Sequence, residues 1–212
     1  MASAQQPGQQ ITPGPQLIDR LLSVMEHEIA PLTAQEVLKG NKLFGAAMLH
    51  KKDLSTIIAG TNQETLNPLF HAEVQTINSY YASPKEKHVE PSEVLFLATH
   101  EPCTLCSSAI TWAGFDNFYY FFSHEDSRDS FQIGHDLKIL KEVFKHGPGE
   151  YARQNSYWTG YNICDLIENC DENNRRSFRQ RAISLRETYQ QLSDLYQQRK
   201  GQSDDPAYIP LR

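Results

Sequence analysis

The sequence has little of what would place it outside ordinary globular enzymes. It contains four cysteines in 212 residues, two of them in a Cys-x-x-Cys, so it has no disulfide framework and a reducing compartment is expected. No run approaches the roughly 18 apolar residues that a membrane span needs. Residues 1–8 lack the basic and apolar segments of a signal peptide. We therefore expect a cytoplasmic protein without membrane association.

A basic excess is also absent, because 20 Lys and Arg face 26 Asp and Glu and give a formal net charge of −6. Broad nucleic-acid binding needs positive surface to displace counterions, so a nucleic-acid partner is not expected. A local contact with RNA stays open through one basic cluster, which comprises Arg175, Arg176, Arg179, Arg181 and Arg186. The composition favours chemistry on a small molecule.

The hydrophobic pattern predicts helices that alternate with the strands of a mixed sheet, in a three-layer α/β/α sandwich. In chain order, the expected elements are an amphipathic helix from Gln16, a β-hairpin of residues 43–49 and 55–59, a helix over 71–81, a buried strand over 94–99, a helix over 103–112 and an aromatic strand over 116–122. The near-continuous apolar run of the 94–99 strand is typical of burial on both faces.

Beyond Ser123 the pattern is weaker. Residues 124–129 are polar and turn-like, residues 136–145 favour a helix, and a further helix is expected to begin near Glu150. The last helix has an apolar stripe at helical spacing, formed by Phe178, Ala182, Leu185, Tyr189, Leu192 and Tyr196. This stripe packs either on the body of the same chain or, as a short coiled-coil seam, on a second subunit.

These patterns divide the chain into four segments. The two ends are rich in Gln, Pro, Gly and other polar residues, which favours a disordered tail at 1–15 and a flexible tail at 201–212. Residues 16–150 are expected to form the main domain. Residues 151–200 are expected to form a helical C-terminal extension that packs on the domain or on a neighbouring subunit.

Cys103 and Cys106 directly follow a proline at the start of a predicted helix. Residues at i and i+3 share a helix face, and the helix N-terminus favours thiolates, so both sulfurs can bind one metal ion. A catalytic zinc site takes three protein ligands and one water. His71 is the best third ligand, because it begins another helix after a strand. Glu73, two residues later, can then take a proton from the metal-activated water.

Each of these residues also has other interpretations. A structural zinc site needs a fourth protein ligand, for which His100 and His124 are candidates. The Cys-x-x-Cys could instead be a redox pair. Cys164 and Cys170 are expected to be ordinary, partly buried thiols. The combination of His-x-Glu, 28 further residues and Pro-Cys-x-x-Cys is more specific than any of its parts.

That combination, His71-Ala72-Glu73 with Pro102-Cys103-Thr104-Leu105-Cys106, matches the signature of zinc deaminases of nucleobases. From Phe44 to Phe122 the chain resembles the cytidine deaminase-like superfamily. Within this region, Ser108-Ala109-Ile110-Thr111-Trp112-Ala113 is similar to the Ala-Ile-x-Trp-Ala of bacterial guanine deaminases. Pro68-Leu69-Phe70 departs from the Pro-Thr-Ala that usually precedes His-Ala-Glu in the family, which bears on the substrate more than on the chemistry.

The resemblance implies that residues 16–150 form a zinc deaminase domain in which His71, Cys103 and Cys106 hold Zn²⁺ and Glu73 moves protons. It also implies a set of substrate-contacting residues. These are a base-binding amide at Asn62, the backbone N–H groups near Ala72 and Cys103 that hold the reacting oxygen, pocket walls at Phe70 and Trp112, and an acidic residue at Asp136, with Asp129 and Asp126 as alternatives. Asn62 could instead close the turn after its strand, and Trp112 could instead pack in the core.

The reaction that the resemblance implies is hydrolytic deamination of a nucleobase-type aminated heterocycle, with guanine or a related purine first. Alternatives are cytidine, another nucleoside or another small aminated ring, then adenosine in RNA. A partner subunit without activity is a further alternative, and the presence of Glu73 argues against it. Because members of the superfamily usually form dimers or tetramers, we expect a homodimer.

Overall fold

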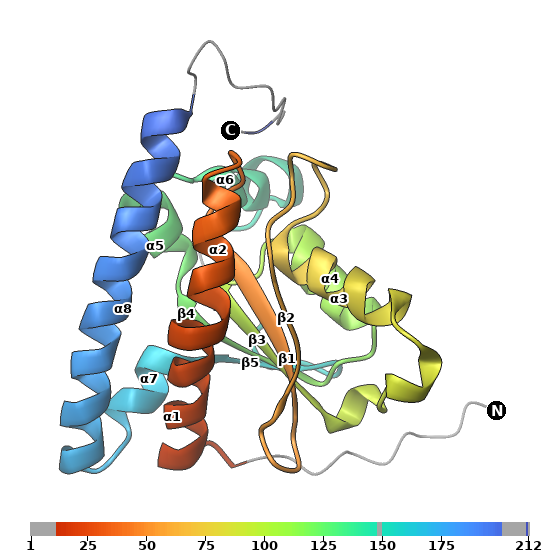
Figure 1. Cartoon of the computed structure of the whole chain (residues 1–212), viewed down its shortest axis with the longest axis vertical. Coiled ribbons are helices and arrows are strands. Elements are labelled where there is room, and N and C mark those ends of the chain that lie inside the picture. The colour runs from red at the N-terminus through yellow and green to blue at the C-terminus, as the bar shows by residue number, and fades with distance from the viewer. Residues whose placement is uncertain (1–11, 148–149, 201–210, 212) are drawn as a thin grey trace.

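In the computed structural model, helices cover both faces of a mixed five-stranded sheet (Figure 1). The predicted three-layer α/β/α sandwich is therefore confirmed. The structure describes residues 12–147, 150–200 and 211. The tails expected at 1–15 and 201–212 lie largely outside these described residues.

The sheet has the strand order β2-β1-β3-β4-β5. Its strands are β1 (Gly45–His50), β2 (Thr56–Thr61), β3 (Val94–His100), β4 (Asn117–Phe122) and β5 (Thr159–Asn162). β1 is antiparallel to β2 and β3, whereas β3, β4 and β5 run parallel. The predicted hairpin and the two buried strands are confirmed. β5 is not predicted, because a half-buried Thr-Gly-Tyr-Asn has no apolar alternation to mark it.

The first predicted helix is continuous but changes its winding. It consists of α1 (Pro15–Val24), a π-helical turn (Met25–Ile29) and α2 (Ala30–Val37). Pro31 has no N–H to donate four residues back, so the local hydrogen-bond pattern shifts just before it. The other helices longer than three residues are α3 (Ala72–Ala82), α4 (Thr104–Trp112), α5 (His124–Asp129), α6 (His135–Ile139) with a π-helical turn (Leu140–Phe144), α7 (Ile163–Glu168) and α8 (Glu172–Arg199).

Two expectations after Ser123 are wrong. Residues 124–129 form helix α5 instead of a turn, because the hydroxyl of Ser123 and the carboxylate of Asp126 make a reciprocal capping box. No helix begins near Glu150, since the described residues 150–158 form a non-helical connection that leads into β5. The segment 151–200 therefore supplies a strand as well as helices.

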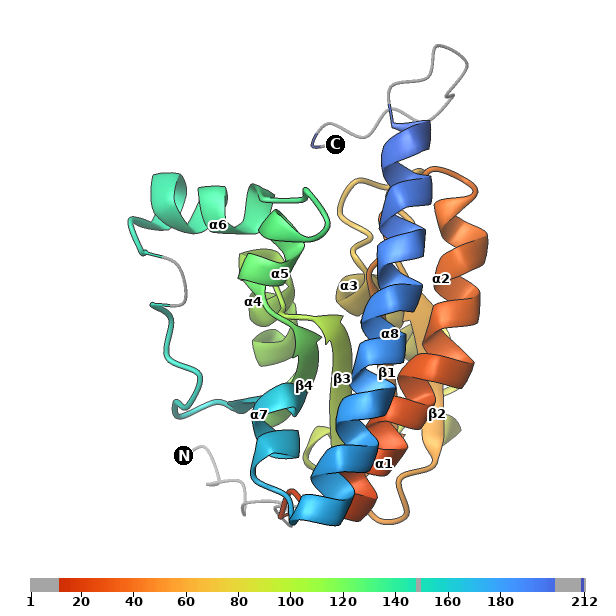
Figure 2. The same ribbon diagram turned by 90° about the vertical axis from the view of Figure 1, so that its left-hand side faces the viewer.

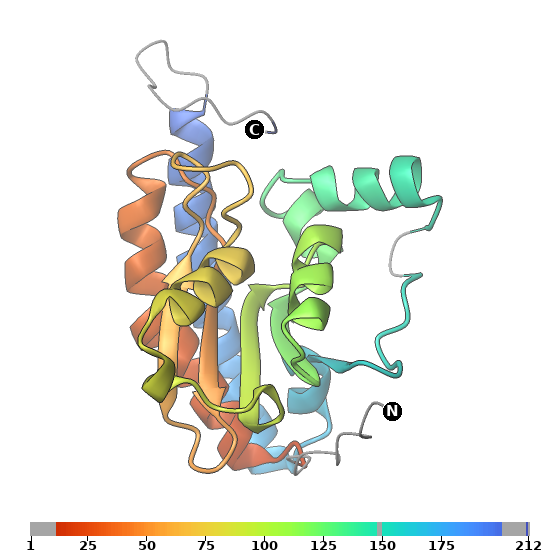
Figure 3. The ribbon, with the colours of Figure 1, turned by 90° about the vertical axis from the view of Figure 1, so that its right-hand side faces the viewer.

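The strands alternate their side chains between two apolar cores. Ala47, Leu97 and Tyr119 belong to the core shared with α1, α2 and α8, whereas Met48 and Phe96 belong to the core that includes residues of α3 and α4. Figures 2 and 3 show these two helical layers from opposite sides. The sheet is thus covered on both faces, which explains the near-continuous apolar sequence of β3 and β4.

Helix α8 packs on its own chain. Its stripe residues Phe178, Leu185, Tyr189, Leu192 and Tyr196 are buried in the core that includes α1 and α2. The guanidinium of Arg181 adds hydrogen bonds to the Asp19, Ser23 and Glu26 side chains of that helical layer. The stripe is therefore not a free coiled-coil seam. None of the helices within the described ranges has both the length and the apolar character to cross a membrane.

Candidate active site at the start of helices α3 and α4

The three predicted metal ligands meet at one edge of the sheet. His71 is the N-cap residue of α3, which follows β2, and Cys103 is the N-cap residue of α4, which follows β3. Cys106 lies one turn into α4 and is buried. β2 and β3 point the same way because each is antiparallel to β1. Their helices therefore begin beside each other, as the sequence predicts.

The ligand atoms form a compact triangle. The Cys103 and Cys106 sulfurs are 3.4 Å apart, and Nδ1 of His71 lies 3.4 Å from the first and 3.6 Å from the second. A tetrahedral zinc ion, with bonds of about 2.1 Å to nitrogen and 2.3 Å to sulfur, holds such atoms about 3.6–3.8 Å apart. No other group of three or more His, Cys, Asp or Glu side chains in the described part of the chain is close enough to share an ion. The donor set fits zinc with one open position.

The protons on these ligands are unevenly distributed in the metal-free protein. The hydrogen bond from Cys106 holds the pKa of Cys103 well below its ordinary value despite burial, whereas burial raises the pKa of Cys106. Burial disfavours a charged His71, but its hydrogen bond to Cys103 and the nearby negative charges raise its pKa to about 9. These shifts favour the thiolate of Cys103 and the protonated ring of His71, and a metal ion that binds here must displace the protons of His71 and Cys106.

Glu73 lies beside the ligands without belonging to them. It is in the first turn of α3 and only 6% exposed. Burial, with the negative charge of Cys103, raises the pKa of Glu73 to about 7, and its carboxyl group forms a hydrogen bond with Cys106. A carboxyl group that exchanges its proton near neutral pH is suited to general acid–base chemistry.

Asn62 and Ala72 have a different arrangement from the one expected. Asn62 is fully buried, its Oδ1 accepts the backbone N–H of Ala72 at 2.5 Å, and its Nδ2 donates to Glu64 at 2.8 Å. The N–H of Ala72 is therefore already engaged within the chain. Asn62 closes the turn after β2 and caps α3, which corresponds to the structural alternative for this residue.

Asp136 comes near the metal ligands through α6. Burial raises its pKa to about 6, with a further contribution from the charge of Cys103 and an opposing one from His124 and His71. The alternatives lie elsewhere, because Asp126 caps α5 and Asp129 pairs on the surface with its neighbour Arg128. Among the three acidic residues considered, Asp136 is thus the one that shares the environment of the site.

The two predicted wall residues differ in position. Phe70 is partly buried and directly precedes His71, so it borders the site along the chain. Trp112 is at the last residue of α4, whereas the metal ligands are at its first turn, and 91% of its surface is exposed. One chain alone therefore brings Trp112 neither to the site nor into the core. An apolar side chain in a helix predicts burial, but it does not predict whether the residue lies at the end of the helix that is near the site.

The other candidate ligands lie outside the metal group. His100 is buried among Phe44, Phe122 and other rings, and its Nδ1 is 2.8 Å from a threonine hydroxyl. His124 places Nε2 3.3 Å from the carbonyl of Pro102. Neither histidine supplies a fourth ligand, which disfavours a closed structural zinc site. Cys164 and Cys170 are free and partly buried, as expected.

The basic cluster on α8 is largely neutralised. Arg179 pairs with Glu168, Arg176 with Glu172, and Arg186 with Asp126. Arg181 is engaged with α1, and Arg175 donates to the carbonyl of Glu168. These arginines serve contacts within the chain, so the structure gives no support to an RNA surface here.

Two buried groups near the site have no sequence signal that singles them out. Glu101, just before the Pro-Cys motif, accepts hydrogen bonds from the hydroxyl of Tyr151 and from Arg153, the latter at 3.0 Å. This contact fastens the connection to β5 beside α4, where Thr104 and Trp158 help to line a cavity of about 300 Å³. The second group, an ion pair between Lys42 and Glu64, lies behind His71.

The comparisons with known proteins agree with this geometry. The family model described as the cytidine and deoxycytidylate deaminase zinc-binding region matches residues 23–122. No curated protein sequence matches significantly. The structure of NE0047 in complex with 2,6-diaminopurine is 17% identical, with 91% of this chain and 86% of that chain covered and a TM-score of 0.50.

Two further solved structures are similar. A mutant of NE0047 in complex with 8-azaguanine is 16% identical over 86% of this chain and 98% of that chain, with a TM-score of 0.51. Guanine deaminase from Bacillus subtilis is 24% identical over 63% of this chain and 80% of that chain, with a TM-score of 0.47. At these identities the NE0047 structures establish a shared fold. The zinc-binding region and the ligand triangle agree, so residues 23–122 carry a zinc-binding region of the cytidine and deoxycytidylate deaminase type.

Proposed function

We propose that the protein is a hydrolytic deaminase of a small aminated heterocycle and that its substrate is guanine or a closely related purine. The observation that carries the proposal is a pair of carboxyl groups that share the environment of the ligand triangle. Glu73 comes from α3 and Asp136 from α6, and their pKa values of about 7 and about 6 lie close to neutral pH. Both groups can therefore gain and lose protons under working conditions.

Zinc held by His71, Cys103 and Cys106 would supply a water molecule whose pKa is lowered to about 7. The contact between the carboxyl group of Glu73 and Cys106 supports a role for Glu73 in receiving a proton beside this position. We assign to Glu73 the transfer of that proton to the substrate ring nitrogen next to the amine-bearing carbon. Once the water oxygen has bonded to that carbon, the same carboxyl group takes the remaining proton of the new hydroxyl group and delivers it to the amine nitrogen. The carbon–nitrogen bond then breaks, the carbon becomes a carbonyl, and ammonia leaves as a neutral molecule.

The choice of a purine rests on Asp136 and on the relatives. An ionised carboxylate accepts hydrogen bonds from ring and amino N–H groups, such as those on the 2-amino edge of guanine. NE0047, whose fold this chain shares, has been crystallised with 2,6-diaminopurine and with 8-azaguanine. The paired arginines of α8 further favour a free base over RNA. A homodimer is part of the proposal, and sedimentation of the full chain tests it.

Ammonia release from a panel of substrates tests the proposed function. Zinc-loaded protein is incubated separately with guanine, adenine, cytosine, cytidine, guanosine and melamine, and guanine is expected to react fastest. Glu73→Gln keeps the shape of the side chain but cannot carry the proton, so it should retain zinc and lose about 10²–10⁴-fold in turnover. Fastest turnover of cytidine or guanosine would refute the purine-base assignment. Wild-type turnover by Glu73→Gln would refute the role of Glu73.

A further inference from the structure

A buried ion pair lies directly behind the metal histidine. Lys42, just before β1, donates from Nζ to Oε1 of Glu64 at 2.6 Å, and its backbone N–H is 3.4 Å from Oε2. The two side chains are only 6% and 1% exposed. Glu64 lies in the loop that connects β2 to α3. The pair thus joins the segment that enters the sheet to the loop that leads to His71.

Stability alone is a poor explanation for this pair. The free energy needed to remove two charges from water roughly cancels the free energy gained from their mutual attraction. Replacing both partners by uncharged side chains therefore often leaves a protein equally stable. An ionised carboxylate kept in the interior therefore suggests a geometric role. The side chains that contact Glu64 show what that role can be.

The first of these side chains is the imidazole of His71. Its Nδ1 faces the two cysteine sulfurs, and its Nε2 lies 3.8 Å from Oε1 of Glu64. A histidine that binds a metal through Nδ1 keeps its proton on Nε2, and that N–H usually points towards a carboxylate, a carbonyl or a water. The negative charge of Glu64 stands on the side where the proton must be. It therefore favours the tautomer that leaves Nδ1 free for the metal.

The second is the amide of Asn62. A carboxylate only accepts hydrogen bonds, so Glu64 requires the NH₂ group of Asn62 to point towards it, as the 2.8 Å contact shows. The carbonyl oxygen of the same amide must then point the other way, where it accepts the first N–H of α3 from Ala72. Glu64 thereby sets the position of the helix start that carries both His71 and Glu73.

We infer that Glu64, held in place by Lys42, is a positioning residue of the metal centre. It orients the ring of His71 and the amide of Asn62, so the ligand geometry exists before zinc binds. The inference rests on the zinc site and is independent of which substrate the protein deaminates. Its test accordingly uses metal binding and not turnover, so it can fail while the proposed function stands.

The test compares zinc affinity in four variants of the full chain, measured by competition with a chromogenic chelator. Glu64→Gln should bind zinc about 10–100-fold more weakly, as is typical when the carboxylate behind a metal histidine is lost. The absorption bands of the Co²⁺-loaded variant should also change, because they report the ligand geometry. The double variant Lys42→Met/Glu64→Gln removes both charges, so it should fold as stably as wild type yet keep the weakened zinc affinity.

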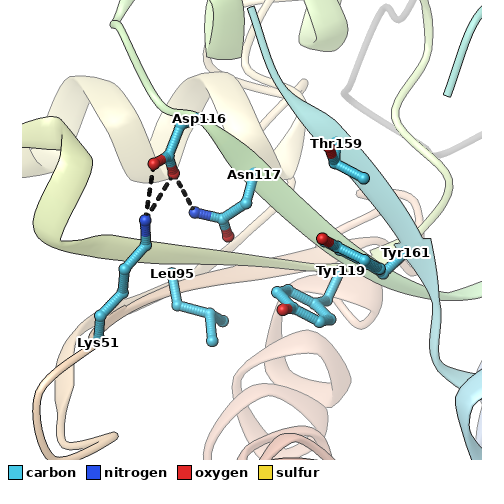
Figure 4. Close-up of a pocket in the computed structure, with 7 residues that line it drawn as sticks. All are labelled: Lys51, Leu95, Asp116, Asn117, Tyr119, Thr159 and Tyr161. Carbon is cyan, nitrogen blue, oxygen red and sulfur yellow. Dashed lines mark hydrogen bonds and ion pairs between the residues drawn. The ribbon is translucent and has the colours of Figure 1, made fainter. Parts of the chain in front are cut away.

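A second ion pair provides a matched control. At the other end of β3, Nζ of Lys51 lies 2.7 and 2.8 Å from the two oxygens of Asp116, in side chains that are 10% and 32% exposed (Figure 4). Strand β3 separates this pair from the metal site by about 20 Å at 3.3 Å per residue. Asp116→Asn should alter the thermal midpoint without changing zinc affinity or the Co²⁺ spectrum.

The outcomes separate a positioning role from a purely structural one. Weaker zinc binding and an altered Co²⁺ spectrum in the double variant, with both unchanged in Asp116→Asn, support the inference. Wild-type zinc affinity in the double variant overturns it, even if Glu64→Gln alone is too unstable to study. Glu64→Asp offers a further check, because it keeps the charge but withdraws it by one methylene group and should also weaken zinc binding.

Discussion

Gly60, on the edge strand β2, packs against α3 with no room for a side chain. A Cβ atom built on Gly60 would lie 2.5 Å from Oγ1 of Thr76, well inside van der Waals contact, but 3.5 Å from the Cβ of the same threonine. Thr76 is 1% exposed, so it cannot turn into solvent. Gly60→Ala therefore forces α3 away from the sheet, and such overpacking costs about 1–3 kcal/mol.

The hydroxyl of Thr76 makes the prediction specific. Its oxygen is buried and has no hydrogen-bond partner among the described residues, so Thr76→Ala should change stability little. In Gly60→Ala/Thr76→Ala the two Cβ atoms would be 3.5 Å apart, an ordinary contact, and most of the lost stability should return. Thr76→Val keeps a methyl group where the hydroxyl was and should not rescue Gly60→Ala.

Thermal and urea unfolding of the single and double variants measure these effects, and a chain of this size loses about 2–4 °C in Tm per kcal/mol. The double-mutant cycle should show a coupling of about 1–3 kcal/mol between positions 60 and 76. The reasoning is refuted if the double variant has the same Tm as Gly60→Ala. It is also refuted if Thr76→Val restores the stability of Gly60→Ala as well as Thr76→Ala does, because the clash then lies elsewhere.

Three further predictions concern the ligands and the surface. At neutral pH and without metal, the ultraviolet absorbance of the protein should include the contribution of one thiolate per chain, because the pKa of Cys103 is lowered well below the usual value of about 8.5. This contribution should disappear in Cys103→Ser. Zinc affinity should rise as the pH increases towards 9, since His71, with a pKa of about 9, and Cys106 must lose protons on binding, and a pH-independent affinity would contradict this. Trp112→Ala should change the unfolding free energy of the monomer by less than about 0.5 kcal/mol, because the side chain is 91% exposed, and a larger loss would show that it has packing partners.

The metal ligands and most of the sheet could be predicted because their signals are local. Cys103 and Cys106 share a helix face by spacing alone, and the aromatic and aliphatic run of β4 requires burial wherever the strand is placed. Ser123 and Asp126 show the limit of such reasoning, because their capping box turns a polar, turn-like stretch into a helix. Strand β5 cannot be predicted for a different reason, because its half-buried residues show no alternation of apolar and polar side chains.

The sequence by itself determined the fold class, the zinc-binding set and the presence of a carboxyl group at Glu73, because each depends on spacing within a few residues or on a motif. Only the tertiary structure decided how the polar groups around that set are satisfied. It showed Asn62 capping α3 and Lys42 paired with Glu64 behind His71. The physical reason is that a buried polar atom takes whichever partner the fold brings to it, and these partners lie far apart in the chain.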